Sequence, residues 1–350
     1  MTVHAPPLDA VFARLIADSG PISIQRYMGE ANACYYDSRD PLGAAGDFIT
    51  APEISQMFGE LIGLWLADIW TRAGRPEPVH YVELGPGRGT LACDALRAAG
   101  RHGLTPQVHL VESSRALRRL QLAALPEAHW HADLTTVPES GPLLLVANEF
   151  LDALPVRQLV KTANGWRERM VGLAEGRLVP VAGAQPMDAA VPAQLHEAPD
   201  GTILETSPGA AAIVGEIAAR LVGQGGAALI IDYGHARTRI GSTLQAVRGH
   251  RRCDPFADPG EADLTAHVDF ASAAAVAQAG CCRWLGTVPQ GSWLRALGID
   301  ARATSLAAAA PDKAAAIGAA RDRLVDAEKM GALFKVMGLA APAWPAGAGF

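Results

Sequence analysis

The chain has 350 residues, of which 49% are hydrophobic, and a formal net charge of −6 at pH 7. This length and apolar content allow a full α/β domain with insertions, or two domains, and they exclude a disordered chain. The negative charge argues against a nucleic-acid partner, because general nucleic-acid binding needs a basic face. The one local cluster, Arg115, Arg118 and Arg119, is typical of a solvated helix face.

The cysteines and apolar segments bear on the compartment. The N-terminus lacks the basic start and apolar core of a signal peptide, and no apolar stretch is long enough to span a membrane. We therefore expect a cytoplasmic protein, or a mitochondrial-matrix protein if a transit peptide has been removed. Without any CxxC pair, neither a disulfide framework nor a metal site is expected from the five cysteines, Cys34, Cys93, Cys253, Cys281 and Cys282.

Residues 1–78 are expected to form a helical region that completes the binding site. Residues 8–30 are typical of one or two short helices. Thr50 and Glu53 have the Thr-x-x-Glu spacing of a capping box at a helix start. Apolar residues then recur at intervals of three and four over 54–69, which predicts a helix packed on the core.

From residue 79 the pattern changes to short apolar runs that alternate with helical segments. Helices are expected at 90–99, 114–122 and 210–221. Continuous apolar runs between helices are typical of parallel strands buried on both faces. Residues 79–340 should therefore form a doubly wound, mostly parallel α/β sheet of the Rossmann-like type. Its strands are predicted at 79–84, 107–112, 129–133, 143–148 and 227–232.

A segment at 151–205 is expected to be a β-rich insertion at the edge of this sheet. Residues 156–181 alternate in polarity like antiparallel strands, with Asn164 and Gly165 at a hairpin turn. Residues 182–200, rich in Ala, Pro and Asp, are typical of a loop.

The C-terminal part carries less information. Residues 249–262 are expected to be a loop, and 270–280 and 302–330 are expected to be helical. Residues 334–337 have the composition of a closing strand. Residues 341–350 are expected to be a loose tail.

A glycine loop follows the first predicted strand, where Glu83 precedes Gly85, Gly87 and Gly89. Glycines at such a turn let the backbone bend sharply and let a ligand approach the main chain. The third glycine lies four positions after the first, whereas the dinucleotide fingerprint GxGxxG needs five. The shorter spacing resembles the first motif of class I methyltransferases, and NAD binding stays as the weaker alternative. The predicted cofactor residues of the loop are Glu83, Gly85, Pro86, Gly87, Arg88 and Gly89.

Polar side chains also end the following strands. Glu112 is placed to accept hydrogen bonds from the ribose hydroxyls of a nucleoside, and Asp133 to accept one from an adenine amine. Asn148 and Glu149 end the fourth strand. Because ligands of such sheets bind at the carboxyl ends of the strands, we expect one crevice that binds S-adenosylmethionine. Its further cofactor residues are Glu112, Ser113, Asp133, Leu134 and Asn148.

Four longer stretches carry a closer likeness: GDFITAPEIS at 46–55, NEFLDALP at 148–155, IDYGH at 231–235 and DLTAHVDF at 263–270. With these motifs the chain resembles the MidA family over most of its length. The resemblance implies a class I methyltransferase fold with an N-terminal helical extension, a β-rich insertion and S-adenosylmethionine as cofactor. The family includes a mitochondrial methyltransferase that assists assembly of respiratory complex I and dimethylates a protein arginine. The resemblance therefore implies a protein substrate with arginine as the acceptor.

The resemblance also assigns roles on the N-terminal side of the site. It implies that Asp47, with Phe48 beside it, holds the ammonium group of the cofactor. The cofactor carboxylate would bind at the helix start at Thr50 and Glu53, where free N–H groups and partial positive charge lie, or at the glycine loop. A plain capping box and turn would explain the same residues.

If the acceptor is arginine, its guanidinium stays charged until attack, because its pKa lies above about 12. Carboxylates must then hold its planar fork, and we expect Glu149 and Asp152 to be catalytic. Glu205 and Asp232, near other strand ends, are reserve carboxylates for the same role. His235 and His267 are candidate proton acceptors, although a hydrogen-bonded structural histidine is the simpler interpretation for each.

Two other functions stay open at this stage. A methyltransferase for a small molecule or another nucleophile would need a deep, enclosed acceptor pocket. An assembly or chaperone protein would bind the cofactor without turnover and would use 151–205 to dock a partner. The oligomeric state is not predicted.

Overall fold

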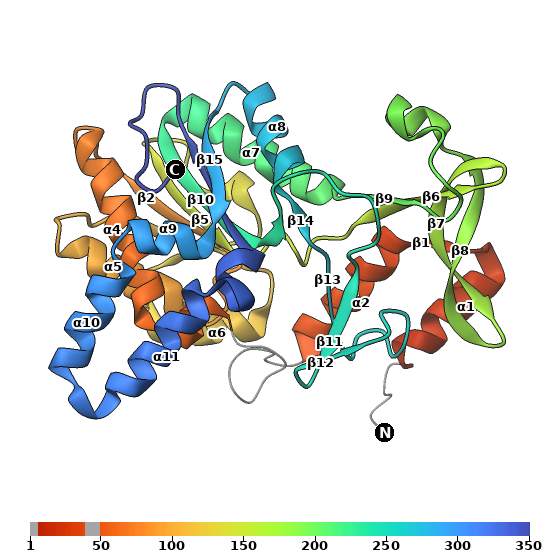
Figure 1. Ribbon diagram of the computed structural model, residues 1–350, viewed down its shortest axis with the longest axis horizontal. Coiled ribbons are helices and arrows are strands. Elements are labelled where there is room, and N and C mark those ends of the chain that lie inside the picture. The colour runs from red at the N-terminus through yellow and green to blue at the C-terminus, as the bar shows by residue number, and fades with distance from the viewer. Residues whose placement is uncertain (1–5, 39–49) are drawn as a thin grey trace. The chain divides into compact units, whose positions relative to one another are not determined.

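The computed structural model describes residues 6–38 and 50–350, which fall into two compact units (Figure 1). We call them the large unit and the small unit. The large unit comprises Asp40–Leu151, Ala211–Thr238 and Val268–Phe350. The small unit comprises Met1–Arg39, Asp152–Ala210 and Arg239–His267.

In the described part of the large unit, eight strands form one sheet in the order β15-β16-β10-β5-β2-β3-β4, with β14 paired to β10. The five neighbouring strands β10, β5, β2, β3 and β4 are parallel, whereas β16 is antiparallel to both β10 and β15. The doubly wound, mostly parallel sheet and its closing strand are thus confirmed. The bounds are β2 (His80–Leu84), β3 (Gln107–Val111), β4 (His129–His131), β5 (Leu143–Asn148), β10 (Gly226–His235), β14 (Val268–Asp269), β15 (Arg283–Pro289) and β16 (Phe334–Ala340).

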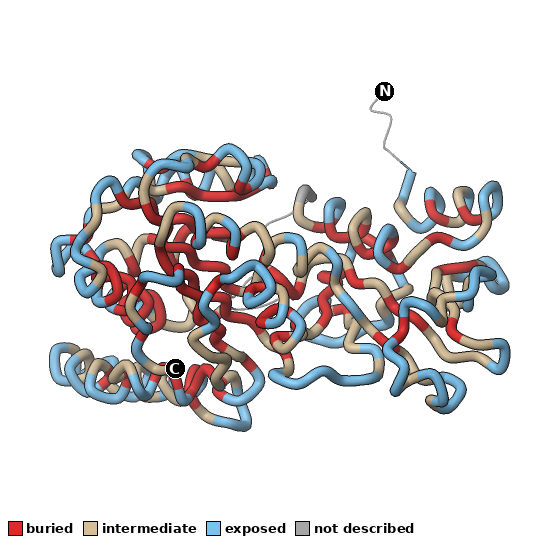
Figure 2. The backbone as a smooth tube through the Cα atoms, turned by 90° about the horizontal axis from the view of Figure 1, so that it is seen from above, coloured by how far each residue is buried: buried red, intermediate tan, exposed pale blue. Residues whose placement is uncertain are grey.

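Helices cover both faces of this sheet, and the buried residues concentrate in the strands between them (Figure 2). On one face, α4 (Gln56–Arg72) and α5 (Thr90–Gly100) pack on alternate strand residues such as Leu144 and Ile231. On the other side, α7 (Pro208–Gln224) packs against α8 (Phe270–Ala279) (Figure 1). None of the helices within 6–38 and 50–350 has the length and apolar character needed to cross a membrane.

The entry to α4 differs from the predicted capping box. Thr50 precedes the short helix α3 (Ala51–Ile54), but its side chain accepts no capping hydrogen bond. Instead Ser55 caps α4, because its hydroxyl oxygen accepts from the Met57 N–H at 3.2 Å. The Glu53 carboxylate instead accepts a hydrogen bond from the Thr90 hydroxyl of α5.

The small unit contains the segment that was expected to be an edge insertion. Its strands pair with one another in a five-stranded sheet, β1-β7-β6-β9 with β8 on β7. The N-terminal helices α1 (Leu8–Ser19) and α2 (Ile24–Ser38) pack against this sheet. A second sheet, β12-β11-β13, lies in the same unit. These strands are β1 (Ile22–Ser23), β6 (Arg157–Thr162), β7 (Gly165–Ala174), β8 (Arg177–Pro186), β9 (Ile203–Thr206), β11 (Gln245–Arg248), β12 (Arg251–Cys253) and β13 (Asp263–Thr265).

Two details of that unit differ from the expected secondary structure. The hairpin between β6 and β7 is present, but Thr162 pairs with Gly165, so its two turn residues are Ala163 and Asn164. The predicted loop at 182–200 begins too early, because β8 continues to Pro186. Strands β11 and β12 also fall in or beside the predicted loop at 249–262.

The last ten residues are packed and are not a loose tail. The Trp65 indole N–H donates to the Ala348 carbonyl at 3.0 Å. The ring of Phe350 lies 6.3 Å from that of Trp65 and 6.4 Å from that of Trp293, which belongs to α9 (Gln290–Ala296). The composition of this segment, rich in Ala, Gly and Pro, concealed these aromatic contacts.

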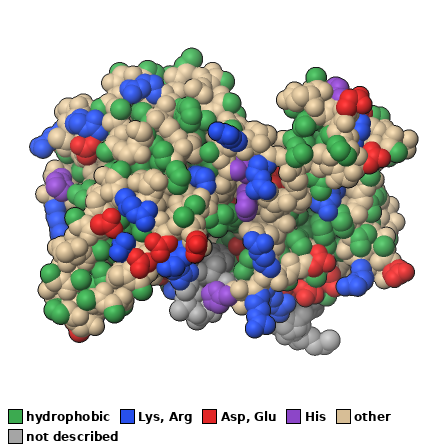
Figure 3. Space-filling model, viewed as in Figure 1, with side chains coloured by type: hydrophobic (Ala, Val, Ile, Leu, Met, Phe, Trp, Pro, Cys, Tyr) green, Lys and Arg blue, Asp and Glu red, His purple; other side chains and the backbone are tan. Residues whose placement is uncertain are grey.

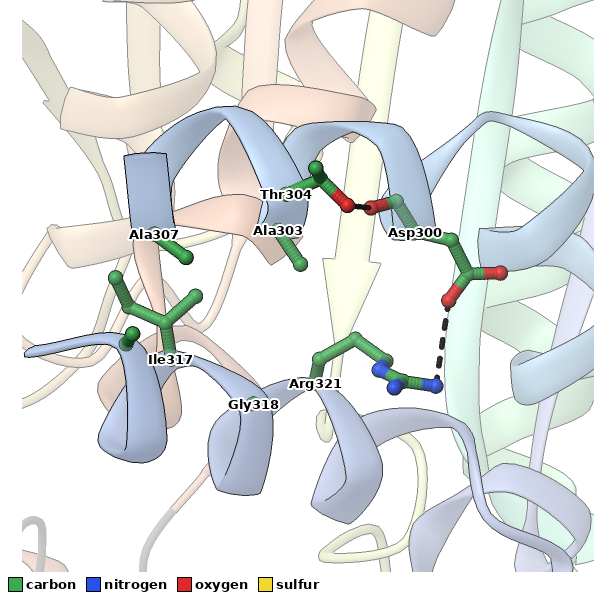
Figure 4. A pocket seen from close by; sticks show the side chains of 8 residues that line it. Asp300, Ala303, Thr304, Ala307, Ile317, Gly318 and Arg321 are labelled. Carbon is green, nitrogen blue, oxygen red and sulfur yellow. Dashed lines mark hydrogen bonds and ion pairs between the residues drawn. The ribbon is translucent and has the colours of Figure 1, made fainter. Parts of the chain in front are cut away.

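The predicted helix at 302–330 is two helices, α10 (Ile299–Ala309) and α11 (Ala314–Val325), with a cavity of about 460 Å³ between them (Figure 4). Arg321 from α11 forms an ion pair with Asp300 of α10 at 3.3 Å across the cavity (Figure 4). None of its lining residues belongs to the predicted site, so the cavity is separate from the predicted binding crevice.

Three histidine side chains form an unbroken hydrogen-bonded chain across β2, β3 and β4. His80 Nδ1 lies 3.0 Å from His109 Nε2, and His109 Nδ1 lies 3.0 Å from His131 Nε2. The chain ends at the Ser140 carbonyl, 2.6 Å from His80 Nε2, and at the Thr136 hydroxyl, 2.9 Å from His131 Nδ1. Because a carbonyl only accepts, His80 must donate from Nε2, and the same neutral tautomer follows for the other two rings. Burial and the neighbouring histidines lower the pKa of His109 to about 4.

The hydrogen-bonded row of histidines predicts that the folded protein is less stable in acid. The lowered pKa of His109 contributes stability that is complete above pH 6.5 and is lost as the pH falls from 6.5 towards 4. The free energy of unfolding should fall over this interval by up to about 3 kcal/mol from His109 alone. Urea denaturation at pH 7 and 4.5 measures the fall, which should be smaller in His109→Gln. The exposed control His102→Gln should match the unaltered protein, and equal falls in all three would contradict the prediction.

Candidate functional site

The glycine loop joins the end of β2 to the start of α5 in the large unit. Gly85, Gly87 and Gly89 have φ of 61°, 54° and 82°, in the left-handed region that favours glycine. At Gly85 a Cβ atom would also lie 2.8 Å from the ring of Phe150. The Gly85 N–H donates to the Val111 carbonyl at 3.0 Å, which fixes the loop beside the end of β3. The loop, which includes Pro86 and Arg88, leads directly into the N-terminus of α5. The first N–H groups of a helix have no partner within that helix.

Glu83 lies immediately before this loop and is only 2% exposed. Its carboxylate accepts a hydrogen bond of 2.6 Å from the Tyr81 hydroxyl. Burial raises the pKa of Glu83 to about 7, against the opposing effect of that hydrogen bond. The group is therefore poised between its neutral and ionised forms at neutral pH.

Glu112, predicted as the last residue of its strand, directly follows β3, which ends one residue earlier. Its carboxylate is held at both oxygens. Oε1 accepts from the Ser114 N–H at 2.8 Å, and Oε2 lies 3.3 Å from Gln121 Nε2. Burial raises the pKa of Glu112, while bonds from the Ser114, Gln121 and Ser113 donors lower it. This arrangement presents an oriented carboxylate at the carboxyl end of the sheet.

Asp133 and Leu134 follow β4, which ends two residues earlier than predicted. Asp133 is exposed and caps the short 3₁₀ helix η1 (Leu134–Thr136), accepting from the Thr135 N–H at 3.0 Å. Leu134 is buried. Capping thus accounts for Asp133 on its own, and a contact to adenine stays a prediction.

Asn148 and Glu149 end β5 with an unusual geometry. Glu149 has φ of 51°, a left-handed conformation that costs on the order of 1 kcal/mol or more for a residue other than glycine. Its Oε1 accepts from the Ala51 N–H at 3.1 Å, at the start of α3, and lies 3.3 Å from Asn148 Nδ2. Among the described residues, the buried Asn148 Oδ1 has no hydrogen-bond partner. Such strain and such an orphaned acceptor are typical of a binding or catalytic site.

The helix start at Thr50 is tied to the glycine loop. The Glu53 carboxylate accepts a 2.6 Å hydrogen bond from the Thr90 hydroxyl, at the first residue of α5. Two predicted contributors, Asp47 and Phe48, lie outside the described residues. The large unit therefore brings together the glycine loop, Glu83, Glu112, Asn148, Glu149, Thr50 and Glu53.

The remaining candidates have structural partners. Asp152 belongs to the small unit and is buried. Burial, the charge of Asp263 and, after these, the charge of Asp152 raise the pKa of Tyr36. Asp232 accepts from the backbone N–H groups of Leu151 at 3.0 Å and Tyr233 at 2.9 Å. The three other candidates are also hydrogen-bonded within their own units. Glu205 accepts from Gln158 and Thr243, and His235 Nδ1 lies 2.8 Å from the Arg237 carbonyl. The backbone N–H of His267 donates to the Thr243 hydroxyl.

Sequence reasoning missed two side chains that shape this site. Thr90 could have been found from the sequence, because it is the first residue of the helix after the last glycine. Gln121 carried no signal, because a glutamine inside a predicted amphipathic helix is ordinary. In the residues that the structure covers, no cluster of three or more His, Cys, Asp or Glu side chains could hold a metal ion.

The chain is similar to several known proteins along most of its length. A family model described as "Putative S-adenosyl-L-methionine-dependent methyltransferase" matches residues 61–288. The chain is 38% identical to protein arginine methyltransferase NDUFAF7, mitochondrial, of Mus musculus, over 93% of the chain and 82% of that protein. It is 37% identical to the Danio rerio protein of the same name, over 95% and 86%. A crystal structure of a COG1565 superfamily member from Burkholderia thailandensis, bound to S-adenosyl-homocysteine, superposes with a TM-score of 0.82 at 29% identity, covering 95% of this chain and 91% of that one.

Proposed function

The chain belongs to this family of S-adenosylmethionine-dependent methyltransferases, and from that premise we propose that it methylates an arginine side chain of a partner protein. The names of the relatives support arginine and a protein acceptor. The structural observation that carries the proposal is Glu149, a carboxylate held in a strained conformation at the carboxyl end of β5. By the family resemblance, a subunit of the respiratory complex I type is the first acceptor to test.

We assign the cofactor to the carboxyl ends of the central strands. Its ribose hydroxyls would bind Glu112 and Ser113, and its adenine would lie by Asp133 and Leu134. The methionine part would lie over the glycine loop near Glu83, Thr50 and Glu53, with Asp47, Phe48 and Asn148 as further contacts. The left-handed glycines of the loop, the oriented Glu112 carboxylate and the orphaned Asn148 oxygen fit a ligand with many hydroxyl and amine donors.

The proposed chemistry is an in-line displacement. When bound, the cofactor supplies a methyl group on a positively charged sulfur. Glu149 would accept N–H bonds from the guanidinium and localise its charge away from the attacking nitrogen. Forming the new N–C bond would break the S–C bond and leave its electron pair on a neutral sulfur. The attacking nitrogen would pass one proton to the Glu149 carboxylate, so the methylated guanidinium would keep a single positive charge. Asp152 stays the second predicted catalytic carboxylate.

Glu83 predicts a pH dependence of cofactor binding. If its carboxylate faces the cofactor ammonium, only the ionised form binds well, and its pKa is about 7. The affinity for S-adenosyl-homocysteine should therefore rise up to about tenfold per pH unit below pH 7 and level off above it. Titration calorimetry from pH 5.5 to 8.5 measures this rise. Tyr81→Phe should move the midpoint to higher pH, because it removes the hydrogen bond that lowers the pKa of Glu83. An affinity that stays flat over this range would reject the assignment.

A labelling experiment tests the proposed reaction. The protein is incubated with methyl-labelled cofactor and a lysate of cells that lack it, and labelled residues are identified by mass spectrometry. Arginine labelled by the protein and not by Glu149→Gln supports the proposal. A labelled metabolite would favour a small-molecule methyltransferase, and cofactor binding without any label would favour an assembly protein.

We propose the cytoplasm as the site of action, with the mitochondrial matrix as the alternative that the names of the relatives support. We also propose that the partner is not a nucleic acid. On the face shown in Figure 3, Lys and Arg side chains are interspersed with acidic and hydrophobic ones. Fractionation of cells with an antibody to the chain distinguishes the compartments.

A further inference from the structure

A buried glutamine lies beneath the glycine loop. Gln121 belongs to α6 (Arg115–Ala124) and is fully buried. Its Nε2 donates to the Gly87 carbonyl at 2.7 Å and lies 3.3 Å from Glu112 Oε2. Its Oε1 accepts from the Trp130 indole N–H at 2.9 Å. One side chain thus contacts both the loop and the acid at the end of β3.

The orientation of this amide is determined by its partners. An indole N–H is a donor only, so the atom facing Trp130 must be the amide oxygen. The two amide hydrogens then point at Gly87 and Glu112, and both find acceptors. Because a buried glutamine is costly unless its polar atoms are paired, this complete pairing explains why an apolar residue does not fill the position.

The contact restrains both parts of the site. Gln121 and the Ser114 N–H hold opposite oxygens of Glu112, so the carboxylate cannot rotate freely. Helix α6 also lies against the loop, since a Cβ atom at Gly89 would be 3.6 Å from Leu125 and 3.9 Å from Gln121. The separation between loop and carboxylate is therefore set by α6.

We propose that Gln121 is a positioning residue for cofactor binding. It couples the glycine loop to Glu112, so that the remaining lone pairs of this carboxylate face the ribose hydroxyls. The inference rests on the proposed function, specifically on the role of Glu112 as the ribose ligand. Trp130 acts one step further away by keeping the amide in the productive orientation.

A double-mutant cycle tests this coupling with S-adenosyl-homocysteine as the probe. The dissociation constant is measured by calorimetry for the unaltered protein, Gln121→Met, Glu112→Ala and the double variant. Gln121→Met should weaken binding about tenfold, the loss expected for one hydrogen bond to a charged group. In the double variant the glutamine change should add less than about twofold to the effect of Glu112→Ala. A residue that only fills the core would give additive effects.

Two controls keep the outcomes distinct. Leu117→Ala removes a buried apolar side chain from the same helix and should lower the melting temperature without changing affinity. Trp130→Phe retains the glutamine but frees its amide, and should weaken binding severalfold even if Gln121→Met fails to fold. Unchanged binding by Glu112→Ala would reject the ribose assignment in the proposed function. Weak binding by Glu112→Ala together with unchanged binding by Gln121→Met and Trp130→Phe, or with additive effects, would overturn the inference alone.

Discussion

Glu149→Gln is expected to lower methyl transfer by at least about 100-fold while leaving affinity for S-adenosyl-homocysteine within about twofold. The amide keeps the size of the side chain and its acceptor oxygen for the Ala51 N–H. It loses the negative charge that would hold a guanidinium and polarise it for attack. Single-turnover assays with labelled cofactor measure the chemical step, and calorimetry measures binding.

A matched control separates charge from backbone geometry. Glu175, in the turn between β7 and β8, has φ of 50°, almost the same as the 51° of Glu149. Glu175→Gln should therefore have normal transfer. If Glu149→Gln also turns over normally, Glu149 has no part in the mechanism.

Gly63→Val is expected to lower the free energy of unfolding by more than about 3 kcal/mol, or to prevent folding. Gly63 lies where α4 crosses α5, and a Cβ atom there would overlap the Ala95 carbonyl. Backbone atoms within a helix cannot move aside as a flexible side chain can. The two helices would have to separate, and the apolar surface between them would lose its contacts.

Urea denaturation measures this loss, and Gly318→Ala in α11 is its control. Gly318 is also helical, but nothing lies within 4 Å of the position of its Cβ atom. That change should stabilise the protein by up to about 1 kcal/mol, the ordinary gain of alanine over glycine in a helix. Equal stability of Gly63→Val and the unaltered protein would show that α4 and α5 do not pack as described.

The central sheet was predictable because its strands are short, apolar and separated by helices. The runs at 79–84 and 143–148, for instance, match β2 and β5 within one residue. The convergence of Glu83, Glu112 and Asn148 follows from the same logic, since parallel strands end at one edge. The apolar runs locate the strand ends, and the parallel fold brings those ends together, so both indicate Glu83, Glu112 and Asn148 as site residues.

Other features depended on partners far away in the chain. Glu53 looked like half of a capping box, but its acceptor oxygen is used by Thr90, 37 residues later. The segment at 151–205 looked like an edge insertion, because nothing local indicates that it pairs with Ile22–Ser23 and forms one compact unit with 239–267. The left-handed conformation of Glu149 is likewise invisible in a sequence, since glutamate has no preference for it.

The discontinuous small unit has a consequence for synthesis on the ribosome. Helix α2 buries Tyr27 and Met28 in the same core as Leu264, and Asn32 bonds to Leu264 across 232 residues. At about 5–20 residues per second, this helix emerges on the order of 10 to 50 s before its partners. Until Leu264 emerges, the part of this helix that packs on it stays exposed as an apolar surface, which is the kind of surface that a holding chaperone binds. The time needed to synthesise residues 239–267, rather than the rate at which the chain folds, should set the time at which this unit first becomes protected from proteolysis.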